Sequence, residues 1–326
     1  MLLKNELPDK NLKMGVVVKM DELLHSLTTE QPNANSNDID RMDTLSILKI
    51  MNQEDKRVAY AVEEKLEQIA MAVDQIVERI KRGGRLLYFG AGTSGRLGIL
   101  DAAECPPTFG TPPEMVQGVM AGGSLGAFEV AREDIEDYKE EGIADVSRKE
   151  VTSLDCVVGI SASGRAPYVL GVLEEAKRRG AFTVSISCND RALIDNIADI
   201  NINVVVGPEV IMGSTRLKAG TAQKMILNMI STATMVKLGK VYKNLMVDVR
   251  PKNKKLIERA KRIIMLATDV PYEEAEKYFE LSNGNAKVAI VMIKAGVDCQ
   301  TACRLLEKNE GFVSKAIEEG MVYENR

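Results

Sequence analysis

Three short segments of the chain combine glycine, hydroxyl and cationic residues, a composition suited to binding an anion or a sugar. They read GAGTSGR at 90–96, GISASGR at 159–165 and GSTRLKAGT at 213–221. Each leads into a stretch with helical periodicity, and the unpaired N–H groups at a helix N-terminus attract phosphate. The candidate ligand-binding residues are therefore the hydroxyl and cationic side chains of these loops: Thr93, Ser94, Arg96, Ser161, Ser163, Arg165, Ser214, Thr215, Arg216 and Lys218.

The first segment also fits the G-x-G-x-x-G pattern of dinucleotide-binding folds. That interpretation requires an acidic residue at the end of the second strand, where it holds the ribose of the cofactor. The predicted second strand instead ends in AGGS at 121–124, without an acid. The hydroxyls and the arginine of the loop suit a terminal phosphate or a sugar better, so we expect no nicotinamide cofactor. Serine and threonine are also ordinary N-caps, but the second, similar loop favours ligand binding.

Proton transfer must depend on side chains other than histidine, because His25 is the only histidine and lies outside the three segments. A single histidine and the lack of a C-x-x-C pair argue against a zinc site, so we expect no metal. Among the acids, Glu104 stands out because it ends an apolar helical run that starts at the first loop, just before Pro106-Pro107. A rigidly held carboxylate suits general acid or base catalysis, although an acid at a helix end is also a common surface feature.

A parallel α/β sheet is predicted to position these residues. Short apolar runs alternate with helical stretches, and near-continuous apolar strands are typical of a sheet covered on both faces. We therefore expect an α/β fold with a doubly wound, parallel five-stranded sheet, whose strand ends bring the loops to a common crevice. The expected strands are 85–90, 115–121, 155–161, 182–187 and 202–206, and the expected helices are 56–81, 94–104, 125–140, 165–179 and 215–237.

The 326 residues divide into three parts by composition. Residues 1–55 form a polar, helix-tending segment, 56–250 the α/β domain, and 251–326 a small all-helical domain of three or four short helices. A formal net charge of −4 excludes the basic footprint of a general nucleic-acid binder. No apolar run is long enough for a signal peptide core or a membrane span. Five scattered cysteines indicate reduced thiols, so we expect a cytoplasmic protein without nucleic-acid or membrane partners.

The two strand–loop–helix units resemble the sugar isomerase (SIS) domain, whose members bind phosphosugars. Four motifs are more specific and resemble the N-acetylmuramic acid 6-phosphate etherases: GAGTSGRLGILDAAECPPTFG at 90–110, SASGRAPYV at 161–169, GSTRLKAGTAQK at 213–224 and NLMVDV at 244–249. Thr29-Glu30, Asn33 and Ile39-Asp-Arg41 resemble the N-terminal segment of that family. The resemblance covers about residues 28–320.

The resemblance implies cleavage of the lactyl ether of N-acetylmuramic acid 6-phosphate with water, without metal or organic cofactor, in the recycling of cell-wall sugars. It implies that Glu104 is the proton donor and that a second catalytic glutamate lies within 129–141. Counting back from Glu141-Gly142 indicates Glu136, with Glu133 as the alternative. It also implies a homodimer, and leaves open which subunit supplies Glu30, Asn33, Arg41 and Lys218 to a site.

Two other classes of protein share these loops. A non-catalytic phosphosugar-binding regulator, like the glucokinase regulatory proteins, would need no acid pair. An aldose–ketose phosphosugar isomerase would also abstract a proton beside a carbonyl, so the loops do not separate it from an etherase. The AAECPPTFG motif at 102–110 and the GSTRLKAGTAQK motif favour the etherase.

Overall fold

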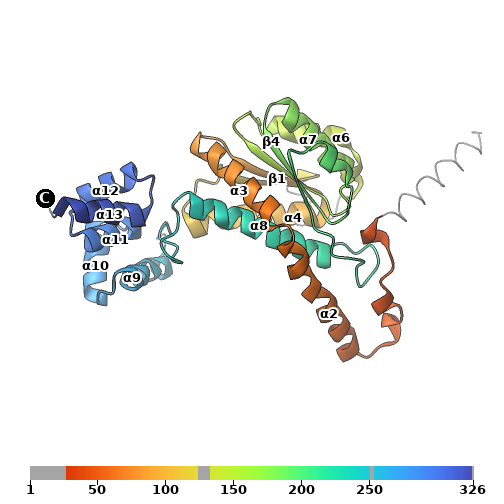
Figure 1. The fold of residues 1–326 in the computed structure, drawn as a ribbon, viewed down its shortest axis with the longest axis horizontal. Helices are drawn as coiled ribbons and strands as arrows, with labels where there is room; N and C mark the ends of the chain where they lie inside the picture. The colour runs from red at the N-terminus through yellow and green to blue at the C-terminus, as the bar shows by residue number, and fades with distance from the viewer. Residues whose placement is uncertain (1–26, 124–132, 250–252, 325–326) are drawn as a thin grey trace, which may run out of the picture.

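A parallel sheet of five short strands forms the centre of the chain (Figure 1). The computed structural model describes residues 27–123, 133–249 and 253–324. The strand order is β2-β1-β3-β4-β5, and every pair is parallel. The chain therefore reverses its winding direction between β1 and β3, the switch point where ligands bind in such sheets. This confirms the predicted doubly wound fold. The strands are β1 (Leu86–Gly90), β2 (Val116–Met120), β3 (Cys156–Ile160), β4 (Phe182–Ser187) and β5 (Ile200–Asn203).

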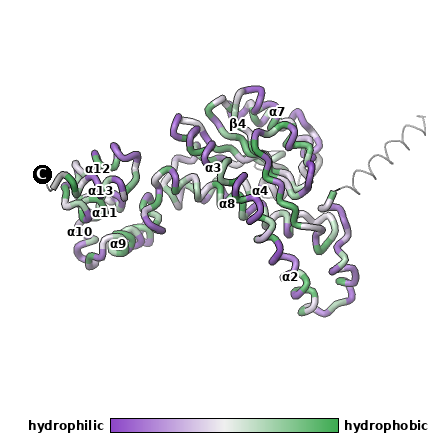
Figure 2. The backbone as a smooth tube through the Cα atoms, in the orientation of Figure 1, coloured by the Kyte–Doolittle hydropathy of each residue, from purple (hydrophilic) through white to green (hydrophobic). Residues whose placement is uncertain are grey.

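Helices cover both faces of the sheet, and all five residues of β1 are buried as a result (Figure 1). Leu86 and Tyr88 point to one face and belong to the same apolar cluster as the helices α3, α4 and α8. Leu87 and Phe89 point to the other face and pack with α6 and α7. Hydrophobic and hydrophilic segments alternate along the helices, as expected when one side of each is buried (Figure 2). The helices are α3 (Leu66–Lys81), α4 (Gly92–Phe109), α6 (Lys139–Arg148), α7 (Pro167–Arg178) and α8 (Lys218–Lys237).

From residue 27 on, where the description of the chain begins, the N-terminal part consists of three short turns and a long helix that extends away from the sheet (Figure 1). The turns are η1 (Thr28–Glu30), η2 (Ala34–Ser36) and η3 (Ile39–Arg41), and the helix is α2 (Thr44–Glu63). The single helix predicted over 56–81 is wrong, since α2 and α3 are separate and α2 begins earlier, where Asp43 accepts a hydrogen bond from the Ser46 N–H. Both helices turn an apolar side toward α8. The spacing of apolar residues therefore continues from α2 into α3 and does not reveal the break between them.

The first loop helix also differs from expectation, because α4 continues through Pro106 and Pro107 to Phe109. The two prolines remove two backbone donors, but Phe109 is buried in the core beneath the last turn. Gly110 then ends the helix in the left-handed conformation, with φ of 64°. Glu104 consequently lies within the helix rather than at its end.

Other predicted boundaries shift by a few residues. The helix predicted over 125–140 falls partly outside the described residues, and the next described elements are a short 3-10 helix, η4 (Glu133–Asp137), and then α6. Strand β5 precedes its predicted position by two residues. Helix α8 begins at 218 rather than 215, so the hydroxyls of the third loop precede the helix.

The C-terminal part is a bundle of five helices in the described residues, where the sequence suggested three or four. Its helices are α9 (Lys254–Thr268), α10 (Tyr272–Leu281), α11 (Ala286–Ala295), α12 (Cys299–Lys308) and α13 (Val313–Glu324). Its apolar core includes Val247 and Val249, so the bundle's packing starts before residue 251. The buried Lys287 of α11 donates to the carbonyl of Gly239 after α8 and pairs with Asp248. None of the described helices combines the length and the apolar character needed to cross a membrane.

Candidate active site

The three glycine- and hydroxyl-rich loops meet at one cavity of about 430 Å³ at the carboxyl ends of β1 and β3. The sequence predicted this convergence, and the topological switch between these two strands produces it. Two arginines and two glutamates carry the charges of its lining, and serine and threonine supply the hydroxyls. The side chains that line it with such groups are Glu30, Thr93, Ser94, Arg96, Glu136, Ser161, Ser163, Ser214, Thr215 and Arg216.

The first loop brings the start of α4 very close to the end of β1. A Cβ on Gly90 would lie 2.8 Å from the Gly95 nitrogen, so only glycine allows this approach. The first N–H groups of α4 have no partner within the helix and carry the positive end of its dipole, which favours an anion. Ser94 is 7% exposed and donates to Gln223 Oε1 of α8 at 3.0 Å. Gln223 is fully buried and fixes this hydroxyl. It lies in the GSTRLKAGTAQK motif, but the sequence did not indicate its contact with the first loop.

The second loop uses its hydroxyls partly to shape its own turn. Ser161 Oγ accepts from the Gly164 N–H at 3.1 Å, and Ser163 Oγ accepts from the Arg165 N–H at 3.3 Å. Gly164 has φ of +69°, and a Cβ there would lie 2.2 Å from Ala192 Cβ. The two hydroxyls also lie 3.4 Å apart, within hydrogen-bond distance of each other, so one donates to the other and one proton remains for a ligand at the cavity. Arg165 does not line the cavity, and its Nε is buried without a hydrogen-bond partner in the described part of the chain.

The third loop places Ser214, Thr215 and Arg216 at the cavity just before α8 begins. Arg216 therefore does not lie in the first turn of the helix, where it would oppose the dipole. Lys218, the first residue of α8, is fully buried and pairs with Glu54 of α2 at 2.5 Å. The structure thus does not bring Lys218 to the cavity, although the sequence suggested it as a ligand. The sequence shows the positive charge of Lys218, but it does not indicate that Glu54, 164 positions earlier, is the partner of that charge.

The predicted catalytic acids lie in different places. Glu136 is in η4 and lines the cavity together with Glu30 of η1. Glu104 is exposed and does not line it, because it lies eight residues beyond Arg96, about 12 Å further along the axis of α4. The side chain of Glu133, the alternative to Glu136, lies outside the part that the structure describes, as does His25.

A second carboxylate, Asp101, lies one turn before Glu104 between α4 and α8. It is 9% exposed and accepts a hydrogen bond from Ser231 Oγ at 3.0 Å, while its Oδ2 has no partner within the described residues. Burial raises the pKa of Asp101 to about 6, although the hydrogen bond from Ser231 and the positive charge of Lys224 act to lower it. No motif in the sequence distinguished this acid from its neighbours. No group of three or more His, Cys, Asp or Glu side chains that could hold a metal occurs in the described residues.

Sheet, switch point and hydroxyl loops together define a SIS domain. Residues 135–233 match the family model described as SIS domain, and residues 68–177 match the glucokinase regulatory protein N-terminal SIS domain. The phosphoheptose isomerase GmhA from Neisseria gonorrhoeae is 18% identical, with a TM-score of 0.47 over 59% of this chain and 98% of that one.

Full-length relatives are much more similar in sequence. The N-acetylmuramic acid 6-phosphate etherase of Clostridioides difficile is 55% identical over 90% of this chain and 96% of its own. The protein of the same name from Geobacillus sp. is 54% identical over 91% of this chain and 100% of its own. The chain therefore belongs to the N-acetylmuramic acid 6-phosphate etherase family.

Proposed function

We propose that this chain is an N-acetylmuramic acid 6-phosphate etherase, a carbon–oxygen lyase of amino-sugar catabolism. It cleaves the lactyl ether of its substrate with water and yields N-acetylglucosamine 6-phosphate and D-lactate. The observation that carries the proposal is the meeting of three hydroxyl-rich loops and the Glu136 carboxylate at one cavity, in a chain 55% identical to a protein named for this activity.

The cavity suits a sugar that carries a phosphate at one end and a carboxylate on its ether. Arg96 in α4 and Arg216 in the third loop supply positive charge to the lining, and the start of α4 adds N–H groups that have no partner within the helix. Charge-assisted hydrogen bonds of this kind are stronger than neutral ones. Positive groups placed at the cavity therefore allow a chain with a net charge of −4 to bind a substrate that carries both a phosphate and a carboxylate.

The reaction has two steps, the elimination of lactate and the addition of water, and each step requires two proton transfers. In the open-chain aldehyde, a base removes the C2 proton while the C3–oxygen bond breaks, and an acid protonates the departing lactate oxygen. Water then adds its oxygen to C3 and a proton returns to C2, so the net change is the exchange of lactate for hydroxide. We assign these transfers to Glu104 and Glu136, because paired carboxylates can alternate as acid and base.

The distance of Glu104 from its own cavity supports a homodimer in which each cavity is completed by the other subunit. Glu104 is exposed, and Leu100 one turn before it is 51% exposed, an apolar side chain suited to an interface. A partner subunit packed against this face of α4 can receive Glu104 at its own cavity. Glu30 already lies at the cavity of its own chain, so it needs no partner.

We also place the protein in the cytoplasm. All five cysteines are free thiols, and three of them, Cys105, Cys156 and Cys188, are buried in the α/β unit. Free thiols throughout a chain are expected in a reducing compartment, where disulfides are rare.

Lactate release from N-acetylmuramic acid 6-phosphate tests the activity directly. The wild-type chain is expected to release stoichiometric D-lactate, and the Glu104→Gln variant is expected to bind N-acetylglucosamine 6-phosphate normally while losing turnover by at least 100-fold. Interconversion of aldose and ketose phosphates without lactate release would instead show an isomerase. Tight binding without any turnover would show a regulator.

Mixing two inactive variants tests the shared site. A heterodimer of Glu104→Gln and Glu136→Gln subunits has one cavity with both glutamates intact if Glu104 serves the partner. Random reassembly at equal amounts then restores about a quarter of the wild-type activity. No restoration, with heterodimers verified by native mass spectrometry, would place both acids in one subunit.

A further inference from the structure

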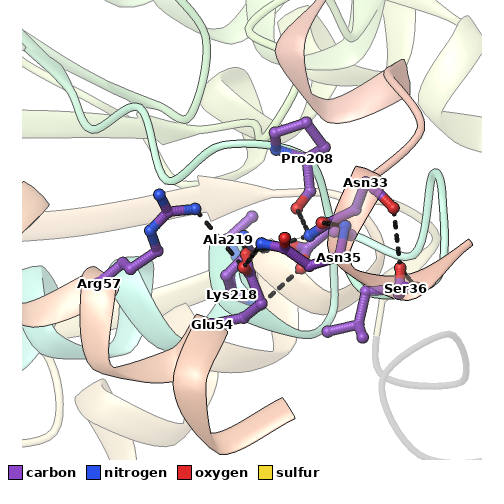
Figure 3. Close-up of polar contacts among 10 residues, drawn as sticks. Asn33, Asn35, Ser36, Glu54, Arg57, Pro208, Lys218 and Ala219 are labelled. Carbon is purple, nitrogen blue, oxygen red and sulfur yellow. Dashed lines mark hydrogen bonds and ion pairs between the residues drawn. The ribbon is translucent and has the colours of Figure 1, made fainter. Parts of the chain in front are cut away.

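A buried ion pair joins α2 to the start of α8 (Figure 3). Lys218 Nζ lies 2.5 Å from Glu54 Oε2, and the two side chains are 0% and 2% exposed. Glu54 also accepts hydrogen bonds from Asn33 Nδ2 at 3.0 Å and Asn35 Nδ2 at 2.9 Å. Burial alone would raise the pKa of Glu54, but the hydrogen bonds from Lys218, Asn35 and Asn33 outweigh it and lower the pKa to about 2. The carboxylate is therefore ionised and fully partnered.

The same lysine is also where the third loop ends. Glu209, which is fully buried, accepts from the backbone N–H of Lys218 at 3.0 Å and from that of Ala219 at 2.9 Å. This carboxylate caps the start of α8 with both oxygens. The chain from 209 to 218 is thus closed into a loop at its base, and Ser214, Thr215 and Arg216 lie at its tip in the cavity.

The N-terminal segment holds the other end of this loop. Asn33 Nδ2 donates to the carbonyl of Pro208 at 2.9 Å, and Ser36 Oγ donates to the carbonyl of Val210 at 2.7 Å. Asn33 therefore contacts both the incoming end of the loop and Glu54 (Figure 3). Both ends of the third loop are fixed by one polar network that involves no ligand.

Stability alone does not explain an ion pair at this position. Taking two charges out of water costs free energy, and apolar residues of similar size often stabilise a core equally well. A directional network does fix geometry more tightly than apolar contacts, because hydrogen bonds specify both distance and angle. We therefore expect the network to contribute more to holding the loop tip in place than to the free energy of unfolding.

We propose that Glu54 is a positioning residue for the third loop: through Lys218 and Asn33 it sets where Ser214, Thr215 and Arg216 stand at the cavity. It raises the affinity for the phosphosugar without touching it. The identity of the ligand rests on the proposed function, but the positioning role is a property of the loop and is tested by binding.

The test compares three variants with the wild-type chain. Glu54→Gln removes the charge, and Glu54→Gln with Lys218→Met removes both charges, so that no unpaired ammonium remains buried. Glu175→Gln is the matched control, because Glu175 is also buried and paired with two arginines, on α7 away from the loop. Binding of N-acetylglucosamine 6-phosphate is measured by calorimetry, and amide hydrogen exchange is followed in the peptide that covers 209–217.

The double variant decides the outcome, since neither member of the ion pair is left as an unpaired buried charge. We expect it to bind the sugar phosphate at least 10-fold more weakly than wild type, with faster exchange at 209–217, while the control binds within 2-fold. Wild-type affinity and unchanged exchange in the double variant would overturn the proposal, and so would an equal loss of affinity in the control. A wild-type chain that binds the sugar phosphate but releases no lactate would refute the etherase activity alone.

Discussion

The buried carboxylate of Asp101 gives the stability of this protein a specific dependence on pH. Its pKa rises from 3.8 to about 6 in the folded chain because burial disfavours the charged form. A raised pKa means that the folded state holds the proton more tightly than the unfolded state. The stabilisation that the protonated Asp101 side chain gives the folded state is therefore fully present below pH 3.8 and is lost as pH rises through about 6. At about 1.4 kcal/mol per pKa unit, the loss amounts to about 3 kcal/mol.

Replacing Asp101 with asparagine removes this titration and keeps the shape of the side chain. The amide oxygen can still accept from Ser231 Oγ, and the amide nitrogen replaces an oxygen that has no partner in the described residues. We expect the free energy of unfolding of Asp101→Asn to exceed that of wild type by about 1–3 kcal/mol at pH 8. Near pH 4 the difference should shrink toward zero or reverse.

Urea unfolding followed by circular dichroism at intervals from pH 4 to pH 8 measures this difference. Subtracting the wild-type curve from that of the variant removes the contribution of other titrating groups. The subtraction matters because Glu54 and Asp155 have lowered pKa values and act in the opposite direction. A difference that stays constant across this range would show that Asp101 titrates alike in both states and would refute the reasoning.

Three further substitutions test the loops and their supports. Arg216→Ala should weaken sugar phosphate binding by about 10- to 100-fold, since a hydrogen bond to a charged group contributes about 1.5–3 kcal/mol, and calorimetry showing under 3-fold would remove Arg216 from the site. Gly164→Ala should destabilise the fold by more than 1 kcal/mol in urea unfolding, because the new Cβ meets Ala192 at 2.2 Å; an unchanged midpoint would contradict that clash. Glu209→Gln should cost about 1–3 kcal/mol by leaving one N–H of α8 without an acceptor, and wild-type stability would show that the cap contributes nothing.

The sheet and the loops were predictable because their signals are local. Each strand is a short apolar run, and each loop carries its glycines and hydroxyls within seven to nine residues. Loops at the carboxyl ends of strands in a doubly wound parallel sheet share one crevice, so the meeting of the first two loops could be predicted without contact information.

The features that the sequence could not reveal depend on contacts between distant segments. The hydrophobic period of 56–81 continues across the break at Glu64 and Lys65, because both helices face α8. A lysine can bind a phosphate or pair with a buried carboxylate, and the sequence around Lys218 does not distinguish these roles. The packing of α2 against α8, which brings Glu54 to Lys218, decides between them. The continuation of α4 past Pro106 likewise depends on the core around Phe109 rather than on helix propensity.

The contacts of the segment from Thr29 to Ser36 also bear on how the chain matures during synthesis. Its partners Asn189, Pro208 and Val210 lie 160, 175 and 174 positions later. A ribosome adds about 5–20 residues per second, so this segment waits at least several seconds after it emerges before these partners exist. Pairings of such long sequence separation also form late in folding, because the loop-closure entropy must be offset first. The cavity is therefore completed only after α8 has been made, and a nascent chain truncated before residue 208 already contains the catalytic glutamates proposed above but lacks the third loop.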